Sequence, residues 1–255
     1  MKFDDFDLKM RAFETANDVC VPAGTWMVAR VDGRSFTRLT KAVCKFEAPY
    51  DERFRDLMTS ASQSLMQSGF NVVFGYVQSD EISLLFDLNE TQFGRKTRKF
   101  NSVLAAHASA NFSLELGQVA TFDCRISQLP DFEHVVDYFR WRQQDARRNA
   151  LNSWCYWRMR ESSSARRAHK RMHGMTVREK KQILFQEFGI DFDLLPRWQR
   201  HGIGLSWVDF KKQAVNPVTG ETVEVDRRKV VVDLELPFGD ELANQIYELN
   251  RVAVG

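Results

Sequence analysis

Three adjacent polar residues, Ser79, Asp80 and Glu81, interrupt one of the most apolar parts of the chain. They lie in the stretch GYVQSDEISLLF at residues 75–86, where β-branched and aromatic side chains on both sides favour two central strands. The pattern predicts a hairpin that presents carboxylates at its tip. An ordinary turn is the alternative, because Ser and Asp side chains also stabilise turns by bonding their own backbone.

A second stretch ends another strand-like run in an acid. In TWMVARVDGRSF, residues 25–36, Asp32 follows the apolar run, and Gly33 permits a sharp bend with a close backbone approach. The next residues, SFTRLTK, are typical of the start of a helix, whose free N–H groups can hold phosphate. Two strand ends carrying Asp32 and Asp80 can share a pair of divalent cations, which is the arrangement of two-metal phosphoryl or nucleotidyl transfer.

The elements that must position these acids follow the order strand, helix, hairpin, helix, strand. Helical spacing of apolar residues predicts helices at about 51–69 and 98–116, and β-branched residues predict a fourth strand at 120–126. This is the β-α-β-β-α-β order of the ferredoxin-like fold, so the expected class is α+β. A short polar helix is expected before it, at residues 4–19.

The second half of the chain predicts a helical region with an arm. One long helix is expected at about 132–160, with an apolar stripe over the sheet that includes Leu151 and Trp154. A shorter helix that follows Thr176 begins with a capping box. Period-two alternation around a turn at residues 216–220 predicts a hairpin arm. The expected domains are a catalytic domain at 1–130 and a basic, helical region at 131–255 with its arm at 202–238.

The net charge of +2 conceals a strongly basic segment. Residues 140–181 hold thirteen Lys or Arg against three acids, so the rest of the chain is net acidic. Trp141, Trp154, Tyr156 and Trp157 lie among these arginines, as in surfaces that bind polyanions. A charged segment is often only a solvated face, but the interleaved aromatics favour contact with a nucleic acid.

Length and composition limit the class of protein. A chain of 255 residues with 44% hydrophobic residues can bury one large core or two smaller ones. No apolar run reaches the roughly 18 residues that a membrane helix needs, and the N-terminal MKFDDFDLKM is too acidic for a signal peptide. The four cysteines form no C-x₂-C pair, which favours reduced thiols. We expect a cytoplasmic protein without membrane contact.

Several of these motifs occur together, and in order, in one known family. RVDGRSF, QSDEISLLF, RKTRKFNSVLAAHASANF, FDCRI and YFRWRQQDARRNALNSWCYW resemble the tRNA-His guanylyltransferase family and its tRNA-repairing relatives, the 3′-5′ nucleotide-adding polymerases. The resemblance covers most of residues 1–210. It implies a polymerase palm with the ferredoxin-like fold, two Mg²⁺ ions, ATP, GTP or other nucleoside triphosphates as substrates, and tRNA as the partner. It also implies a homotetramer, for which the arm is a candidate contact.

The resemblance implies roles for individual residues. Asp32, Asp80 and the Gly33 carbonyl match the metal ligands, and Glu81 matches a neighbouring acid with a supporting part in catalysis. By this resemblance the expected nucleotide contacts are Asp32, Gly33, Arg34, Ser35, Phe36, Thr37 and Ser79, with Arg95, Lys96, Lys99 and Arg125 on the triphosphate. The long helix adds Arg147, Arg148 and Asn149, which are expected to project toward the site from its polar side. From the basic charge of the segment, tRNA contacts are expected at Arg166, Arg167, Lys170 and Arg171.

One departure from the family pattern bears on the reaction. Where eukaryotic members carry His-Ile-Asn-Asn-Leu-Tyr-Asn, residues 147–153 read Arg-Arg-Asn-Ala-Leu-Asn-Ser, and Cys124 replaces a glycine. In this respect the chain resembles bacterial and archaeal relatives, which implies template-dependent repair of 5′-truncated tRNA rather than untemplated guanylate addition to tRNA-His. Two other classes stay open. A cyclase-like palm enzyme would not need the basic segment, and a non-catalytic RNA-binding protein would not need Asp32 and Asp80.

Overall fold

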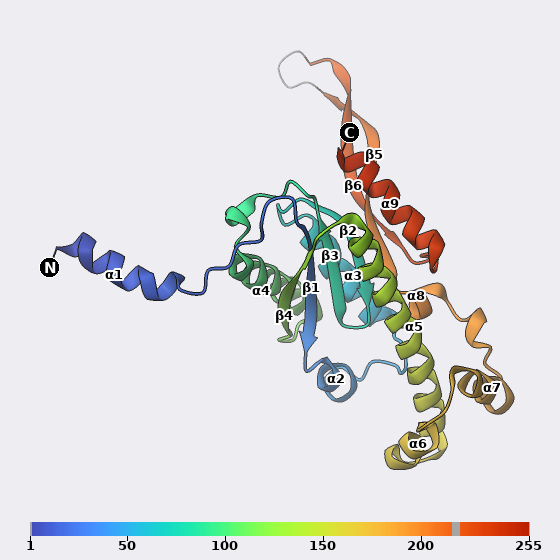
Figure 1. The fold of residues 1–255 in the computed structure, drawn as a ribbon. Coiled ribbons are helices and arrows are strands. Elements are labelled where there is room, and N and C mark those ends of the chain that lie inside the picture. The colour runs from blue at the N-terminus through green and yellow to red at the C-terminus, as the bar shows by residue number, and fades with distance from the viewer. Residues whose placement is uncertain (1, 216–219, 255) are drawn as a thin grey trace.

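The computed structural model describes residues 2–215 and 220–254, and its centre is a six-stranded antiparallel sheet in the described part of the chain (Figure 1). The strands are β1 (Trp26–Arg34), β2 (Val72–Gln78), β3 (Glu81–Phe86), β4 (Thr121–Leu129), β5 (Ile203–Val215) and β6 (Thr222–Asp233). The α-helices are α1 (Phe3–Thr15), α2 (Phe36–Arg38), α3 (Glu52–Met66), α4 (Thr97–Leu116), α5 (Phe132–Ser162), α6 (Ala165–Met172), α7 (Val177–Phe188), α8 (Arg197–His201) and α9 (Asp240–Val254). A π-helix η1 (Leu39–Val43) and two 3₁₀ helices, η2 (Gln92–Arg95) and η3 (Phe192–Leu194), complete the set.

The first four strands and helices α3 and α4 have the ferredoxin-like arrangement. The strand order in the sheet is β4-β1-β3-β2-β5-β6, so β1 and β3 are central and the chain order β1-α3-β2-β3-α4-β4 is the one expected. The predicted α+β fold is therefore confirmed.

Side-chain alternation along β1 gives the sheet two apolar faces. Met27, Ala29 and Val31 belong to a core that also holds buried residues of α3 and α4. Trp26 and Val28 point to the opposite face and join a core with residues of α5 and α9. The sheet is thus the middle of three layers, which fixes the position of both strand ends at its tip.

The long helix α5 covers the sheet with only its first half. Its residues Val135, Val136 and Phe139 pack in the sheet core. The expected stripe is wrong further along, because Leu151 and Trp154 pack in a separate cluster with residues of α7 and η3. The cause is length: a helix of 31 residues is about 46 Å long and extends beyond the sheet. The capping box at Thr176 and Glu179 is present as predicted.

The arm is continuous with the catalytic sheet. β5 pairs with β2 from Phe74↔Ser206 to Val77↔Ile203, and β6 pairs with β5 at the edge of the sheet that the described residues form. The arm was expected as a separate feature, but its base extends the sheet. Part of the turn expected at residues 216–220 lies outside the described residues. Helix α9, which was not anticipated, covers the sheet beside α5.

Candidate active site

Two strand ends bring Asp32 and Asp80 together at the tip of the sheet. Asp80 lies in the two-residue turn between β2 and β3, as the hairpin interpretation predicts, and Asp32 is directly opposite Glu81 in the register of β1 and β3. The Gly33 N–H donates to the Asp80 carbonyl at 2.9 Å. This bond locks the end of β1 to the hairpin tip, so the two carboxyl groups share one small region.

Gly33 is needed at this tip for a steric reason. A Cβ at position 33 would lie 2.6 Å from the Phe36 ring, which is buried in the core beneath. Ser35 and Ser79 flank the acids with positive φ angles of 60° and 50°. Non-glycine residues rarely adopt this backbone region, and such strain concentrates at functional sites. The helix start expected at SFTRLTK is present, as a single α-helical turn, α2, that continues into the π-helix η1.

The acid pair carries negative charge that the described part of the chain does not neutralise. Ser79 Oγ donates to Asp80 Oδ1 at 3.1 Å, but no Lys, Arg or His of the described residues forms an ion pair with Asp32 or Asp80. Burial raises the pKa of Asp80, and the charge of Asp32 raises it further. A bound cation would relieve both effects, so the donor set fits a metal that favours oxygen ligands.

The two carboxylates of Asp32 and Asp80 suit Mg²⁺ better than a metal that needs a complete cage of protein ligands. Within the described residues no group of three or more His, Cys, Asp or Glu side chains could form a complete metal cage. Mg²⁺ is commonly held by one or two carboxylates, with substrate phosphates and water supplying the other ligands. Asp32 and Asp80 provide that partial set.

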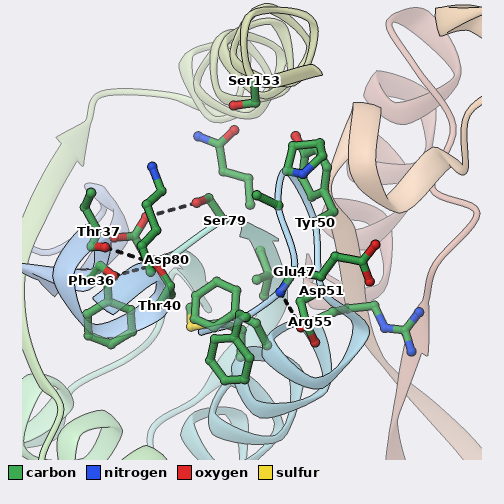
Figure 2. Close-up of a pocket in the computed structure, with 18 of the residues that line it drawn as sticks. Phe36, Thr37, Thr40, Glu47, Tyr50, Asp51, Arg55, Ser79, Asp80 and Ser153 are labelled. Carbon is green, nitrogen blue, oxygen red and sulfur yellow. Dashed lines mark hydrogen bonds between the residues drawn. The ribbon is translucent and has the colours of Figure 1, made fainter. Parts of the chain in front are cut away.

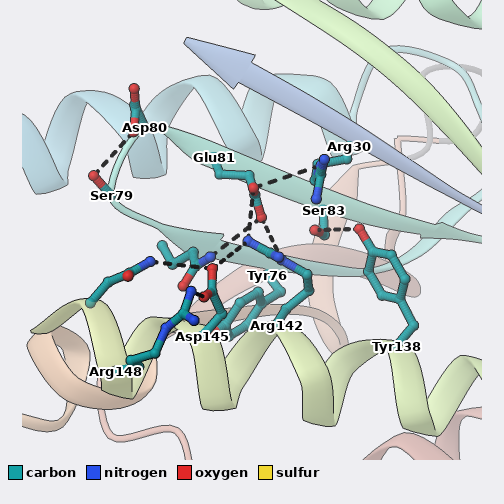
Figure 3. A network of polar contacts seen from close by, with 12 residues as sticks. Arg30, Tyr76, Ser79, Asp80, Glu81, Ser83, Tyr138, Arg142, Asp145 and Arg148 are labelled. Atoms are coloured by element: carbon teal, nitrogen blue, oxygen red, sulfur yellow. Dashed lines mark hydrogen bonds and ion pairs between the residues drawn. The ribbon is translucent and has the colours of Figure 1, made fainter. Parts of the chain in front are cut away.

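Among the residues that the structure describes, Glu81, unlike Asp32 and Asp80, is paired with arginines. Arg142 from α5 binds it with two hydrogen bonds, Nε to Oε1 at 2.7 Å and an Nη to Oε2 at 2.9 Å, and Arg30 lies 3.7 Å from Oε2 (Figure 3). Burial raises the pKa of Glu81, while Arg142 and Arg30 oppose the rise. Because Glu81 is already paired, its position in the structure is that of an anchor between the sheet and α5. Arg142 also donates to Asp145 at 3.2 Å.

Two cavities meet at Asp80. The first, about 200 Å³, lies beside Thr37, Tyr50 and Ser153 and has an aromatic lining (Figure 2). The second, about 370 Å³, runs along α5 and is lined by Asp32 and by polar side chains of that helix. The residues common to both are Pro49, Tyr50, Gln78, Ser79, Asp80, Ser153 and Trp198. A site with two adjoining cavities can hold two reactants against one pair of acids.

The family of this chain follows from comparison with known proteins. The family model described as "tRNAHis guanylyltransferase" matches residues 7–130, and the model described as "Thg1 C terminal domain" matches residues 133–235. A probable tRNA(His) guanylyltransferase of Bos taurus is 31% identical over 238 residues, which are 88% of this chain and 77% of the relative. One from Mus musculus is 32% identical over 209 residues, covering 78% and 69%.

This chain belongs to the tRNA-His guanylyltransferase family. Members of the family are nucleotidyltransferases, and the chain is an enzyme of this class that adds nucleotides to tRNA. Among solved structures, a bacterial tRNA(His) guanylyltransferase (Thg1)-like protein in complex with ATP has a TM-score of 0.76 at 25% identity, covering 96% of this chain and 98% of that one. The enzyme from Saccharomyces cerevisiae has the same fold, with a TM-score of 0.71 at 23% identity over 77% and 91%.

Not every residue that the family pattern suggested lies at this site. Arg95 is buried and donates to the backbone carbonyls of Val21, Thr25, Leu88 and Glu90. Its guanidinium therefore stabilises the loop ahead of β1, and the expectation that it holds a triphosphate is corrected. Thr25 precedes Asp32 by seven residues of extended chain, about 20 Å.

Lys96 and Lys99 lie at the same far end of β1 as Arg95. The N–H of Thr97 bonds Val19 O at 2.9 Å, and Lys96 pairs with Asp18 at 3.1 Å. Lys99 lies over the Phe93 ring. Within one chain these lysines are thus about 20 Å from the acid pair, too far to contact a triphosphate held at Asp32 and Asp80.

Arg125 is close to the acid pair. It lies on β4 opposite Arg30, on the face of the sheet that carries Asp32, and Asp123 binds it at 3.0 Å. That hydrogen bond raises the pKa of Arg125, with smaller contributions from Asp32 and Glu81. More than half of its side chain is exposed, so it is available to a phosphate.

The three residues expected on α5 divide between two directions. Asn149 lines the second cavity and donates to Asp145 at 3.2 Å, while Arg148 is exposed and also pairs with Asp145. Arg147 was expected to face the site, and this is corrected. It binds Asp193 at 2.6 Å and His201 at 3.0 Å, and so faces away from the acids. One helical turn places neighbours on different faces, which the sequence pattern alone did not resolve.

The remaining predicted contacts are at the surface or in the core. Arg34, Ser35 and Thr37 are exposed beside Asp32, whereas the Phe36 ring is buried and reaches only the wall of the first cavity. Arg166, Arg167, Lys170 and Arg171 are all exposed on α6, and Arg171 pairs with Glu187 of α7. No helix in the described part of the chain is both long and apolar enough to cross a membrane.

Sequence reasoning missed Arg30, Gln78, Arg142 and Asp145. Arg30 and Asp32 are two residues apart on β1 and so share a face, which the alternation of the strand indicates. Arg142 and Asp145 are three apart on a helix, a spacing that pairs charges. The sequence contains both spacings, but a spacing does not show that the Arg142 side chain is buried.

Proposed function

We propose that this enzyme repairs 5′-truncated tRNA by template-dependent addition of nucleotides in the 3′-5′ direction, with Mg²⁺ as its metal. The observation that carries the proposal is the pair Asp32 and Asp80, without a cationic partner among the described residues; both line the second cavity, and Asp80 also lines the first. One cavity is sufficient for a hydrolase or a binding protein, whereas a transfer reaction needs room for a donor and an acceptor.

Asp32 and Asp80 would hold Mg²⁺, with the Gly33 carbonyl as a further ligand by resemblance. When bound, the metal would neutralise charge on the phosphates that react. The family reaction implies activation of the tRNA 5′-phosphate by a triphosphate such as ATP or GTP, then attack by the 3′-hydroxyl of the incoming nucleotide with loss of the activating group.

The protein side chains supply orientation and charge. Arg125 on β4 and Arg148 on α5 are exposed cations, suited to phosphate oxygens. Arg142 holds Glu81, and with it the hairpin that carries Asp80, at a fixed distance from α5. Because the acids cannot move apart easily, the reacting groups are positioned before the reaction begins.

The side chains of residues 147–153 on α5 support template-dependent selection of the nucleotide. Within residues 147–153, Arg147 is engaged by Asp193 and His201, while Asn149 lines the second cavity and Arg148 is exposed and pairs with Asp145, which also lines it. An arginine and an amide can hold phosphate and sugar without reading a base. Selection of the incoming nucleotide would then come from pairing with the opposite strand of the acceptor stem.

The exposed cations of α6 support tRNA as the macromolecular partner. Arg167, Lys170 and Arg171 line a concave surface with Ser162 and Ser163 at the end of α5. A cyclase acting on free triphosphates has no use for this surface. A non-catalytic RNA-binding protein has no use for an uncompensated acid pair.

A matched set of four substrates tests the proposal. Each is a tRNA that lacks its first 5′ nucleotide, carries a different base opposite the gap, and has a chemically activated 5′ end so that only transfer is measured. We expect each substrate to accept the complementary nucleotide from the four triphosphates offered singly. Incorporation of guanylate whatever the opposing base would return the enzyme to untemplated addition on tRNA-His.

A further inference from the structure

The N-terminal helix α1 is left exposed by its own chain. It stands away from the body of the molecule (Figure 1), and none of its described side chains is buried. An isolated helix of 13 residues is marginal in water, because the cost of nucleation is spread over few hydrogen bonds. A stable α1 therefore needs packing that its own chain does not supply.

One stripe of α1 is apolar and has the spacing of a two-helix seam. Phe3, Phe6, Met10 and Phe13 follow one another at intervals of three, four and three residues, and they are 77%, 46%, 49% and 73% exposed. Intervals of three and four are those of positions a and d in a heptad repeat. Leu8 is also exposed but lies on the opposite side of the helix, about 180° from the stripe.

The charges beside the stripe specify a partner and a direction. With Phe3 at position a, Lys2 and Lys9 occupy g positions, and Asp7 and Glu14 occupy e positions. In a parallel pair of helices each g residue faces the e residue five positions later on the other helix, so Lys2 meets Asp7 and Lys9 meets Glu14. An antiparallel pair would instead bring Asp7 near Asp7 and Lys9 near Lys9.

We propose that α1 pairs in parallel, in register, with α1 of a second copy of this chain. The stripe then packs Phe3, Phe6, Met10 and Phe13 each against its own counterpart. The net negative charge of the helix argues against RNA or an anionic membrane as its partner. Its residues Asp4, Asp5, Asp7 and Glu14 outnumber Lys2, Lys9 and Arg11, so RNA phosphates or an anionic membrane would be repelled.

Cross-linking of the full chain tests the pairing. A Phe13→Cys variant is made in a Cys20→Ser background, because Cys20 is an exposed native thiol. A parallel pair brings residue 13 of the two copies together, and we expect an intermolecular disulfide under mild oxidation. The control, Leu8→Cys in the same background, faces away and should give at least about ten-fold less product.

The alternatives give different results in the same assay. In an antiparallel pair with Phe6 opposite Met10, the two copies of residue 13 are about 15 Å apart, and only a mixture of Phe3→Cys and Phe13→Cys chains would cross-link. The proposal is overturned if only that mixture cross-links. It is also overturned if neither the mixture nor the Phe13→Cys chain by itself cross-links.

Charge reversal supplies a second, independent test. Lys9→Glu should weaken self-association in light scattering over a dilution series, by about three- to ten-fold in the midpoint, and adding Glu14→Lys should restore it. Phe6→Asp with Phe13→Asp should raise the midpoint by about 100-fold, and Leu8→Asp should leave it unchanged. Equal midpoints for all four variants would exclude α1 from the contact. None of these side chains is buried in the chain, so the fold is preserved.

Discussion

Arg142 and Glu81 form a two-pronged ion pair that joins α5 to the hairpin carrying Asp80. Nε and one Nη of Arg142 donate to the two carboxylate oxygens at 2.7 and 2.9 Å, and both side chains are almost fully buried. Breaking a buried pair leaves an uncompensated charge, whereas breaking an exposed pair costs little.

The first prediction follows from this contrast on a single helix. Arg142→Met should lower the free energy of unfolding by about 3 kcal/mol, because Glu81 keeps its burial and loses its main partner. Arg148→Met should cost less than about 1 kcal/mol, although Arg148 also pairs with a carboxylate, since 70% of its side chain is exposed. Urea denaturation at pH 7 measures both. Equal losses of unfolding free energy in the two variants would mean that the buried Arg142 pair stabilises the fold no more than the exposed Arg148 pair.

The acid pair gives a second prediction, on activity. Asp32→Asn and Asp80→Asn should each lower the rate of nucleotide transfer by at least about 100-fold, because a charged ligand for the metal is lost. Binding of tRNA and the unfolding midpoint should change little. Asp56→Asn is the matched control, since Asp56 is exposed on α3 and pairs with Arg55. Near wild-type turnover in either site variant would refute the metal assignment.

How far the sequence predicts this site depends on the kind of signal. Asp32 and Asp80 were found because apolar strands frame them, and strand ends are visible in a pattern of β-branched residues. Arg95 is assigned to the triphosphate by the resemblance alone, and a sequence motif does not show that its guanidinium is satisfied by four backbone carbonyls of the loops before β1 and after β3. The Arg142 pair needs two elements 61 residues apart to meet, which no local pattern contains.

A third prediction concerns the salt dependence of tRNA binding. Replacing Arg166, Arg167, Lys170 and Arg171 by Ala should weaken binding and lower the slope of log affinity against log salt by roughly two to four units, because fewer counterions are released. The control exchanges Lys and Arg at the same four positions, which keeps the charge, and its slope should match the wild type. Filter binding at several salt concentrations distinguishes them. An unchanged slope in the Ala variant places the tRNA elsewhere.

The fourth prediction is a pH dependence of stability. Hydrogen bonds from Arg53 and from two backbone N–H groups lower the pKa of Asp51, the N-cap of α3, to about 2. A carboxyl whose folded pKa lies below its usual 3.8 stabilises the fold above pH 4, and this contribution is lost as pH falls toward 2. Asp51→Asn retains a capping oxygen but cannot ionise. The difference in unfolding free energy between wild type and variant should therefore shrink between pH 4 and pH 2. A constant difference would contradict the assignment.

Gly33 supports a fifth prediction. Gly33→Ala places a methyl group against the Phe36 ring, which is confined by the core, so the unfolding free energy should fall by about 1–3 kcal/mol. The end of β1 should shift with it, and transfer should slow more than triphosphate binding weakens. Adding Phe36→Leu should recover part of the stability, because the smaller side chain leaves room for the methyl. Failure of this rescue would show that the loss has another origin.

The pairing of β5 with β2 bears on how the chain folds as it is synthesised. β2 ends at Gln78, but the strand that completes its outer side begins at Ile203. At about 5–20 residues per second, the ribosome adds the intervening segment over roughly ten seconds. During that time the catalytic sheet exposes an unpaired edge rich in β-branched and aromatic residues, the kind of surface that recruits other chains. The emerging protein is therefore a candidate for chaperone protection until β5, which begins about four fifths of the way along the chain, has been made.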